Sequence, residues 1–245
     1  MSGGRDDLAD DDFVANDSDL GVRTLSAIVM LAVAGGALWF GGFVWFALVV
    51  AAGFAVVFEF GKLVGDAGFK SAPRAAWAAF ALIYVGIACW ALIYVRSLEL
   101  GLGIRAALFL IGIVIATDIG AYFAGRMIGG PKIAPKISPS KTWAGLFGGM
   151  ILAGLYAYLF VRIALEGLPF VQDYLVQIVM LATSFAILAQ CGDFLESWLK
   201  RRAGAKDSGN LIPGHGGVFD RVDGLLAVMF ISGLTLIYFM VTGSI

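Results

Sequence analysis

The chain has 245 residues, of which 60% are apolar and only 14% are charged, and its mean hydropathy is +0.90. Soluble domains are typically about 45–50% apolar, so this composition excludes a water-soluble globular protein and indicates a membrane protein. The formal net charge of −1 is uninformative, because the charges are confined to a few segments of the chain.

Residues 1–21 form an acidic head with seven Asp residues and a single Arg. A segment this acidic and this poor in aromatic residues is predicted to be a disordered tail. It has neither the basic region nor the cleavage site of a removable signal peptide, so we expect the first membrane helix to target the protein.

Five stretches without a charged residue follow the head: residues 24–58, 75–95, 142–161, 174–192 and 224–245. Each of the last four is long enough to cross a hydrocarbon core of roughly 30 Å once. The first stretch is too long for one crossing, which predicts a tight helical hairpin near Gly41-Gly42. Residues 106–125, interrupted only by Asp118, form one more candidate span.

The predicted fold is therefore an all-α, polytopic membrane protein with about seven transmembrane helices. Further short or re-entrant segments would raise that number to eight or nine. With seven spans, 14 of the 17 Lys and Arg residues fall on one side, and only Arg96, Arg105 and Arg162 fall on the other. By the positive-inside rule, we expect the N-terminus and the long basic loops to be cytoplasmic and the C-terminus to be outside.

The densest group of charges follows the sixth predicted span. Asp193, Glu196, Ser197 and Lys200 stand at i, i+3, i+4 and i+7, which places all four on one helical face. Carboxylates at a membrane boundary suit a metal ion, and cations beside them suit a polyphosphate. The alternative is an ion pair that only helps the helix end to emerge from lipid.

A glycine-rich segment, residues 202–217, continues this group and contains Lys206 and His215. Backbone N–H groups in such a segment can turn toward an anion, although any flexible connection has the same composition. His215 is a candidate acid or base, a phosphate ligand or a brace for the loop.

The last predicted span opens with Asp220, Arg221 and Asp223. Asp223 lies just before an apolar run, which predicts that it is the N-cap of that helix. Asp193 and Asp220 lie on neighbouring spans and are placed to share a cation. Mg²⁺ suits them, because it needs few carboxylates when substrate phosphates and water supply the other ligands.

A second polar group lies on the same predicted side. Asp118 and Tyr122 are one helical turn apart and Arg126 follows one turn later, so Asp118 is either a functional acid or the structural partner of Arg126. The sequence Ser138-Pro-Ser140-Lys141-Thr142 precedes a long apolar helix, and hydroxyls and a lysine at a helix start form a phosphate site. The alternative is N-capping by Ser140 or Thr142, with Lys141 bound to lipid headgroups.

These residues together resemble a known family. Ser197-x-Leu-Lys-Arg-x4-Lys-Asp-x-Gly-x2-Ile-Pro-x-His-Gly-Gly-Val-x-Asp-Arg-Val-Asp223 resembles the signature of the phosphatidate cytidylyltransferases, or CDP-diacylglycerol synthases. The segments that begin at Asp118 and Ser138 resemble the second motif of that family, so the similarity spans residues 118–223. One position departs: the family usually carries an acid after Lys-Thr-Trp, and Ala144 stands there in this chain.

The resemblance implies that CTP and phosphatidate react to give CDP-diacylglycerol and pyrophosphate, in phospholipid biosynthesis, with Mg²⁺ and a second, monovalent cation such as K⁺. It implies that Asp193 and Asp220 bind the metal. It also implies a homodimer. With the positive-inside bias, we expect an active site at the cytoplasmic face of a bacterial inner (plasma) membrane, membrane lipid as a partner and no nucleic acid. We accordingly expect an acidic tail at 1–21, N-terminal membrane helices at 22–117 and a catalytic membrane domain at 118–245.

Two sets of side chains complete this prediction. The candidate catalytic residues are Lys200, Arg201, Lys206, Asp207, His215, Arg221 and Asp223. The candidate substrate- or cofactor-binding residues are Asp118, Tyr122, Arg126, Ser138, Ser140, Lys141 and Thr142. We expect the lipid phosphate to attack the CTP α-phosphorus in line, with these cations neutralising the repulsion between two polyanions.

Two alternatives stay open on the sequence. A secondary transporter or anion channel, with Asp118 and Asp193 as coupling sites, fits the number of spans, although its charges would be expected at the membrane midplane. A related enzyme acting on another lipid phosphate, or a CTP-dependent lipid kinase, fits the same motifs.

Overall fold

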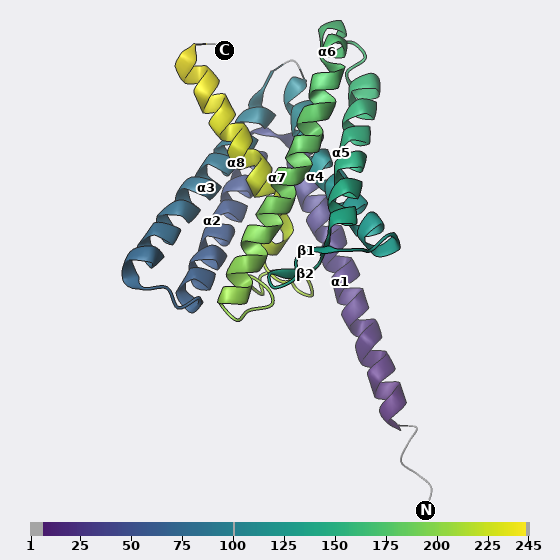
Figure 1. Ribbon diagram of the computed structural model, residues 1–245, viewed down its shortest axis with the longest axis vertical. Helices are drawn as coiled ribbons and strands as arrows, with labels where there is room; N and C mark the ends of the chain where they lie inside the picture. Colours follow the sequence, from purple (N-terminus) through teal and green to yellow (C-terminus); the bar gives the residue numbers. More distant parts are fainter. Residues whose placement is uncertain (1–6, 100, 244–245) are drawn as a thin grey trace, which may run out of the picture.

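The computed structural model describes the backbone of residues 7–99 and 101–243 and the side chains of residues 21–99, 101–168 and 171–243. Seven helices in this part of the chain are long and apolar enough to cross a membrane. They are α1 (Asp7–Phe40), α2 (Gly42–Asp66), α3 (Ser71–Ser97), α4 (Leu102–Met127), α5 (Trp143–Ala164), α7 (Leu175–Arg202) and α8 (Phe219–Thr242). The all-α prediction of about seven spans is confirmed, and the start of α1 and the end of α8 lie at opposite ends of the structure (Figure 1).

The acidic head differs from the prediction of a disordered tail. Helix α1 begins at Asp7 and runs without interruption into the first membrane span, whose apolar part starts at Gly21. Acidic residues are favourable in the first turns of a helix, where the macrodipole is positive. Residues 1–6 lie outside the described part of the chain, so the prediction for them stays untested.

The predicted hairpin at Gly41-Gly42 is confirmed, because α1 ends at Phe40 and α2 begins at Gly42. Both glycines have positive φ values, 65° and 50°, which other residues adopt at a steric cost. Arg96 of α3 binds two backbone carbonyls in the last turn of α1. Its Nε donates to the Leu38 carbonyl at 2.8 Å, and its Nη2 donates to the Trp39 carbonyl at 3.1 Å. This basic residue on the sparsely charged side therefore caps a helix.

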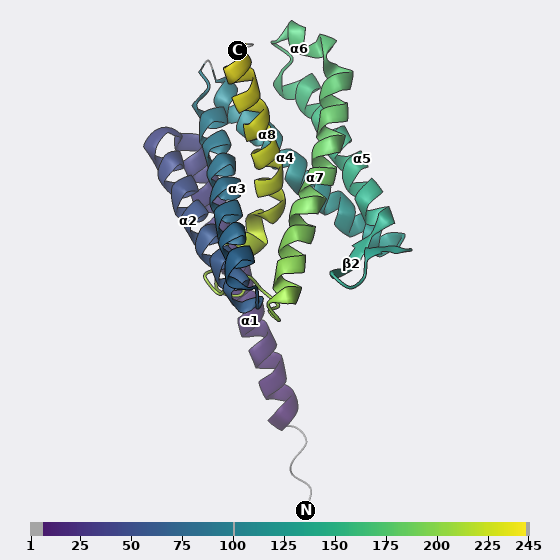
Figure 2. The ribbon, with the colours of Figure 1, turned by 60° about the vertical axis from the view of Figure 1, so that its left-hand side comes forward.

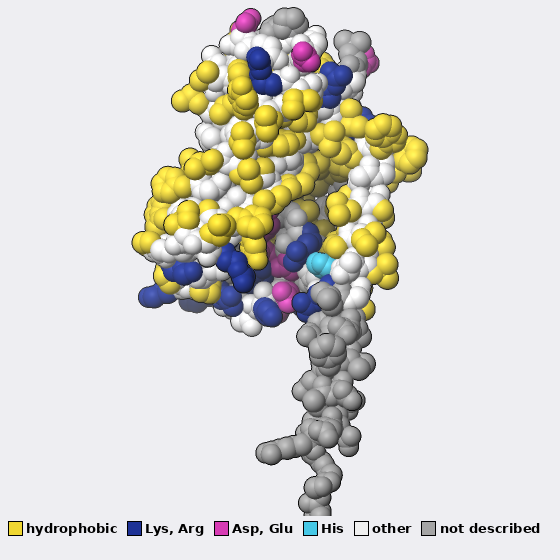
Figure 3. All heavy atoms as spheres, turned by 90° about the vertical axis from the view of Figure 1, so that its right-hand side faces the viewer, with side chains coloured by type: hydrophobic (Ala, Val, Ile, Leu, Met, Phe, Trp, Pro, Cys, Tyr) yellow, Lys and Arg dark blue, Asp and Glu magenta, His cyan; other side chains and the backbone are white. Residues whose placement is uncertain are grey.

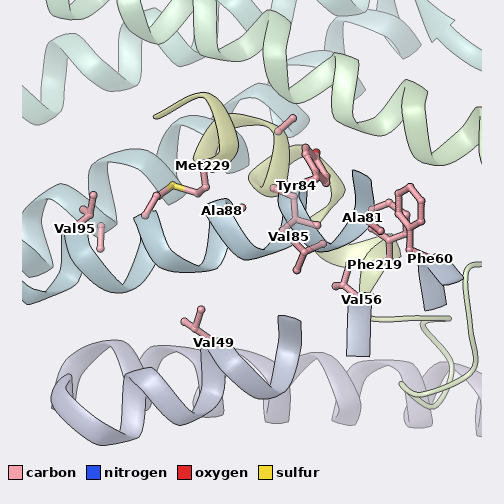
Figure 4. Close-up of a cluster of buried hydrophobic side chains, with 14 of the residues drawn as sticks. Val49, Val56, Phe60, Ala81, Tyr84, Val85, Ala88, Val95, Phe219 and Met229 are labelled. Atoms are coloured by element: carbon pink, nitrogen blue, oxygen red, sulfur yellow. The ribbon is translucent and has the colours of Figure 1, made fainter. Parts of the chain in front are cut away.

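The helices pack in a continuous series, with α2 against α3, α3 against α8, α8 against α7, α7 against α5 and α5 against α4 (Figures 1 and 2). One buried cluster lies mainly among α1, α2, α3 and α8, and Figure 4 shows its centre around Phe60, Tyr84, Phe219 and Met229. A second cluster lies mainly among α4, α5 and α7. Helices α4, α7 and α8 contribute buried residues to both clusters, so they connect the two halves of the bundle.

Helices α4 and α5 approach closely because small residues face each other. A Cβ atom added at Gly120 would lie 2.4 Å from the Gly148 carbonyl oxygen. Small residues at such interfaces are the usual way in which membrane helices pack, because lipid provides no hydrophobic drive for association.

A short antiparallel hairpin joins α4 to α5 and was not predicted. Strand β1 (Lys132–Ala134) pairs with β2 (Ser138–Thr142), with Lys132 opposite Thr142 and Ala134 opposite Ser138. Thr142 is the N-cap of α5, and its Oγ1 accepts from the Gly145 N–H at 3.0 Å. The predicted cap is therefore confirmed, while Ser138–Lys141 belong to a strand instead of a helix start. The short α6 (Pro169–Asp173) connects α5 to α7.

We expect Gly120→Ala to destabilise the protein, because the new methyl group would force α4 away from the α5 backbone. Overpacking of this kind typically costs about 1–3 kcal/mol. The matched control is Gly86→Ala in α3, where an added Cβ meets no atom within 4 Å. Thermal unfolding in detergent measures both variants. Equal midpoints for Gly120→Ala and Gly86→Ala would contradict the packing described.

Candidate active site

Most charged residues of the described chain gather at the end of the bundle where α7 ends and α8 begins. The loop between these helices, residues 203–218, and the β1–β2 hairpin lie at this same end (Figures 1 and 2). Figure 3 shows acidic and basic side chains in a hollow below a band of hydrophobic side chains, with the single histidine of the chain at its edge. The two groups of residues that the sequence singled out therefore share one region.

Asp220, in the first turn of α8, fixes the loop. Its Oδ2 accepts from the Ser208 N–H at 2.9 Å, the Ser208 hydroxyl at 2.9 Å and the Gly217 N–H at 2.8 Å. Its Oδ1 accepts from Lys200 Nζ at 2.7 Å. One carboxylate thus joins two points of the loop, Ser208 and Gly217, to α7 and α8.

Glu59 of α2 is a second anchor and was missed as a site residue. It is only 2% exposed. Its Oε1 accepts from the Val218 N–H at 3.0 Å, and its Oε2 accepts from the Phe219 N–H at 2.8 Å and lies 3.0 Å from the Ser208 hydroxyl. A carboxylate from another helix therefore satisfies the free amides at the positive end of the α8 dipole.

This arrangement corrects the prediction for Asp223. Helix α8 begins at Phe219, five residues earlier than a helix capped by Asp223 would, so Asp223 lies within the helix and is not its N-cap. Glu59, distant in sequence, performs the capping instead. The signal for Glu59 in the sequence is that it is the acid that ends the long uncharged run at residue 58.

Helices α7 and α8 face each other through two levels of charged residues. At the outer level, Lys200 Nζ lies 2.7 Å from Glu196 Oε2 and 2.7 Å from Asp220 Oδ1. At the inner level, Asp193 forms an ion pair with Lys141, whose Nζ also donates to Gln190 Oε1 at 3.0 Å. Lys141 comes from β2, so the hairpin and α7 meet at this pair.

Asp223 lies at the inner level, beside Asp193. The two carboxyl groups interact electrostatically, and a Cβ atom at the adjoining Gly224 would lie 3.3 Å from Asp193 Oδ1. Asp223 Oδ1 accepts from the Gly224 N–H at 2.9 Å. The carboxyl group nearest to Asp193 on α8 is thus that of Asp223, while Asp220 lies one turn farther out and is bound to Lys200.

The cluster contains more acids than bases. Asp118 of α4 interacts electrostatically with Asp193 and Lys141, which gives five carboxyl groups (Asp118, Asp193, Glu196, Asp220, Asp223) near two ammonium groups (Lys141, Lys200). Among the described side chains, Glu196 Oε1 and Gln190 Nε2 are the buried polar atoms without a hydrogen-bond partner. Excess negative charge and an unpaired carboxylate oxygen fit a cation.

The acids do not form a complete metal site on their own. Within the described residues, no three His, Cys, Asp or Glu side chains are grouped so that they could hold a metal ion. A cation at Asp193 would therefore need further ligands from outside the protein, such as phosphate oxygens and water, as Mg²⁺ commonly does.

A polar cavity of about 660 Å³ lies beside the cluster. Its lining includes four predicted catalytic residues, Lys206, Asp207, His215 and Arg221, together with Arg23 of α1. The loop supplies most of the wall, and Gly214 and Gly216 turn there with positive φ values of 73° and 83°. A volume of this size lies within the range of about 300–1,000 Å³ that is typical of ligand pockets.

His215 is oriented by Ser26 of α1, a residue that the sequence did not single out. The Ser26 hydroxyl donates to the Arg23 carbonyl at 3.0 Å and lies 2.8 Å from His215 Nδ1. Ser26 therefore contacts both the α1 backbone and the imidazole, and it fixes the orientation of the His215 ring toward the polar cavity.

Of the other predicted residues, Tyr122, Arg126, Ser140 and Arg201 are exposed, whereas Ser138 is buried. Arg126 Nη1 donates to the Tyr122 hydroxyl at 3.4 Å on an exposed face of α4, so the alternative Asp118–Arg126 pair is replaced by this contact. Arg201 Nε donates to the Ile137 carbonyl at 3.4 Å and thereby touches the hairpin. The hydroxyls of Ser138 and Ser140 lie 3.5 Å from each other.

We expect Glu59→Gln to loosen the loop and lower the thermal stability. The neutral amide keeps one acceptor oxygen but places an NH₂ group against a backbone N–H, and a hydrogen bond to a charged group contributes about 1.5–3 kcal/mol. Glu99→Gln is the control, because Glu99 is exposed in the α3–α4 connection. Thermal unfolding and limited proteolysis of residues 203–218 measure the effect. Unchanged protection of this loop in Glu59→Gln would refute the anchoring role.

Comparison with known proteins agrees with this geometry. The chain is 44% identical over 155 residues to a phosphatidate cytidylyltransferase of Brucella suis biovar 1, which covers 62% of this chain and 53% of that protein. It is 40% identical over 149 residues to one of Bacillus subtilis, covering 61% and 53% respectively. It therefore matches about half the length of these curated relatives.

A sequence model described as the cytidylyltransferase family matches residues 68–239. The match contains α3, α4, α5 and α7, the β hairpin, the glycine-rich loop and most of α8. Because it covers more than half of the chain, this protein belongs to the cytidylyltransferase family.

Proposed function

We propose that the protein is a phosphatidate cytidylyltransferase, which converts CTP and phosphatidate to CDP-diacylglycerol and pyrophosphate. The observation that carries the proposal is the pairing of Lys141 from the hairpin with Asp193 of α7, and of Lys200 of α7 with Asp220 of α8, next to a basic cavity at one end of a membrane bundle. The printed names of the relatives support the same reaction. Both substrates are anionic, and the described cations suit them.

The reaction needs charge neutralisation more than it needs a general base. A phosphate monoester is largely ionised near neutral pH, so its oxygen can attack the CTP α-phosphorus directly while the bond to the β-phosphate oxygen breaks. Lys206, Arg221 and His215 line the cavity and are placed to bind phosphate oxygens. Positioning and electrostatic stabilisation then provide most of the rate enhancement.

The acids are the proposed site for Mg²⁺. Asp193 and Asp220 would hold the ion, with Asp223 beside Asp193 as a further donor, and bound Mg²⁺ would withdraw charge from the phosphates of CTP. Asp220 Oδ1 would have to exchange Lys200 for the ion, which would release this ammonium group toward substrate phosphate. A monovalent cation such as K⁺ at the remaining acids belongs to the same proposal.

The orientation in the membrane follows from the charges. Fourteen of 17 basic residues would face the cytoplasm, where CTP is found, so we place the active site at the cytoplasmic face of a bacterial inner membrane. The homodimer implied by the resemblance stays a prediction. A transporter is less well supported, because the charged cluster lies at one end of the bundle and not at its midplane.

The assay for the proposal is release of pyrophosphate from CTP in detergent, with and without phosphatidate, and identification of the lipid product by mass spectrometry. We expect turnover only when phosphatidate and Mg²⁺ are both present. Pyrophosphate release without lipid, or transfer of the γ-phosphate to the lipid, would contradict the proposed reaction.

Within that assay, Asp193→Asn and Asp220→Asn are expected to lose about a hundredfold or more in turnover at limiting Mg²⁺, which corresponds to roughly 3 kcal/mol. Asp66→Asn is the control, because Asp66 is exposed at the end of α2. Thermal unfolding shows whether Asp220→Asn acts by loosening the loop, because loss of the loop anchor lowers the unfolding midpoint. Near-normal turnover of both variants would refute the metal assignment.

A further inference from the structure

A second cavity, of about 590 Å³, lies deeper in the bundle and is enclosed by α1, α2, α3 and α8. We call it the apolar groove. Among the side chains that line it, Arg221 is the only charged one. Two other lining side chains, Trp45 and Cys89, carry a polar hydrogen, and each donates it to a backbone carbonyl. Trp45 Nε1 donates to the Leu92 carbonyl at 3.3 Å, and Cys89 Sγ donates to the Val49 carbonyl.

The apolar groove adjoins the polar cavity. Ile212 and Arg221 line both of them, so these two side chains lie at the boundary between the polar cavity and the apolar groove. From Arg221 the groove follows one face of α8, along Val222, Leu225 and Met229. Eight residues of helix correspond to about 12 Å, which is close to the roughly 15 Å hydrocarbon thickness of one leaflet.

Small residues of α2 and α3 leave space for the groove, and α1, which packs loosely on the bundle, forms its outer side. Ala52, Gly53 and Ala88 line it, and Figure 4 shows Val49 of α2 opposite Ala88 of α3. Its outer wall is the face of α1 that carries Val29 and Val33. In the most apolar window of α1 only 11% of the residues are buried, against 33% in each of the other six spans.

We propose that the apolar groove holds one acyl chain of the lipid phosphate substrate, with the phosphate at Arg221 and with α1 as the outer wall. The proposal rests on the proposed function, and it assigns the lipid position to α1 and α2, which lie before the region matched by the family. A headgroup in the polar cavity and a tail of leaflet length in a dry groove correspond to the two ends of one amphipathic molecule.

The test is to fill the groove with a larger side chain. Ala52 is half-buried and lines the groove, while Ala47 on the same helix is exposed and lies outside it, so Ala52→Phe and Ala47→Phe form a matched pair. We expect Ala52→Phe to raise the KM for a long-chain phosphatidate about tenfold, equivalent to about 1.4 kcal/mol of binding. The KM for CTP, the turnover of a dihexanoyl phosphatidate and all values for Ala47→Phe should stay near those of the unmodified chain.

An equal effect of Ala52→Phe on long-chain and short-chain lipids, or none on either, would overturn the proposal. A second measurement does not depend on turnover. Phosphatidate with a photoreactive diazirine in its acyl chain should label peptides from residues 29–34 and 48–56. Unlabelled phosphatidate should compete with this labelling and phosphatidylcholine should not.

Labelling that both lipids reduce equally would show that any membrane lipid fills the groove and would overturn the proposal. Selective labelling by phosphatidate without formation of CDP-diacylglycerol would instead refute the proposed reaction and leave the groove assignment supported. The failures of the two proposals are therefore distinguishable.

Discussion

Two buried carboxylates determine where the glycine-rich loop lies. Glu59 from α2 and Asp220 from α8 both contact Ser208, and together they bind the amides of Ser208, Gly217, Val218 and Phe219. An unpaired carboxylate at this depth would be costly, so Ser208 and the C-terminal end of the loop are held in place by these hydrogen bonds. The loop in turn positions Lys206 and His215 around the polar cavity. A loop that its composition describes as flexible thereby becomes a fixed wall.

The same region has more carboxyl groups than ammonium groups. Lys141 pairs with Asp193 of α7, and Lys200 pairs with Glu196 of α7 and Asp220 of α8, so the acids outnumber the lysines. Such a cluster costs free energy at a membrane boundary and therefore marks a functional site. The proposed cation-assisted reaction of polyphosphates explains it best. The apolar groove would add a place for the hydrophobic end of the proposed lipid substrate. One end of the bundle would then accommodate ion, nucleotide and lipid within reach of one another.

Much of this could be predicted from the sequence, because membrane spans and charge segregation are local properties. The spans, the turn at Gly41-Gly42 and the Thr142 cap follow from hydropathy and from the preferences of single residues. The contacts of Glu59 and Ser26 could not, because each joins residues more than 140 positions apart. The start of α8 was misplaced for the same reason, since its cap comes from another helix.

The β hairpin was not predicted, because both of its strands are short and β2 contains Pro139, which weakens the sequence pattern of a strand. Its role is nevertheless specific: it carries Lys141 to Asp193, across 52 positions of the chain. The convergence of these two motifs on one electrostatic unit is the central claim. A double-mutant cycle with Lys141→Met and Asp193→Asn, measured as turnover with CTP and phosphatidate, tests it most directly. The account predicts a coupling energy of about 1.5 kcal/mol or more, whereas additive effects within about 0.5 kcal/mol would contradict it.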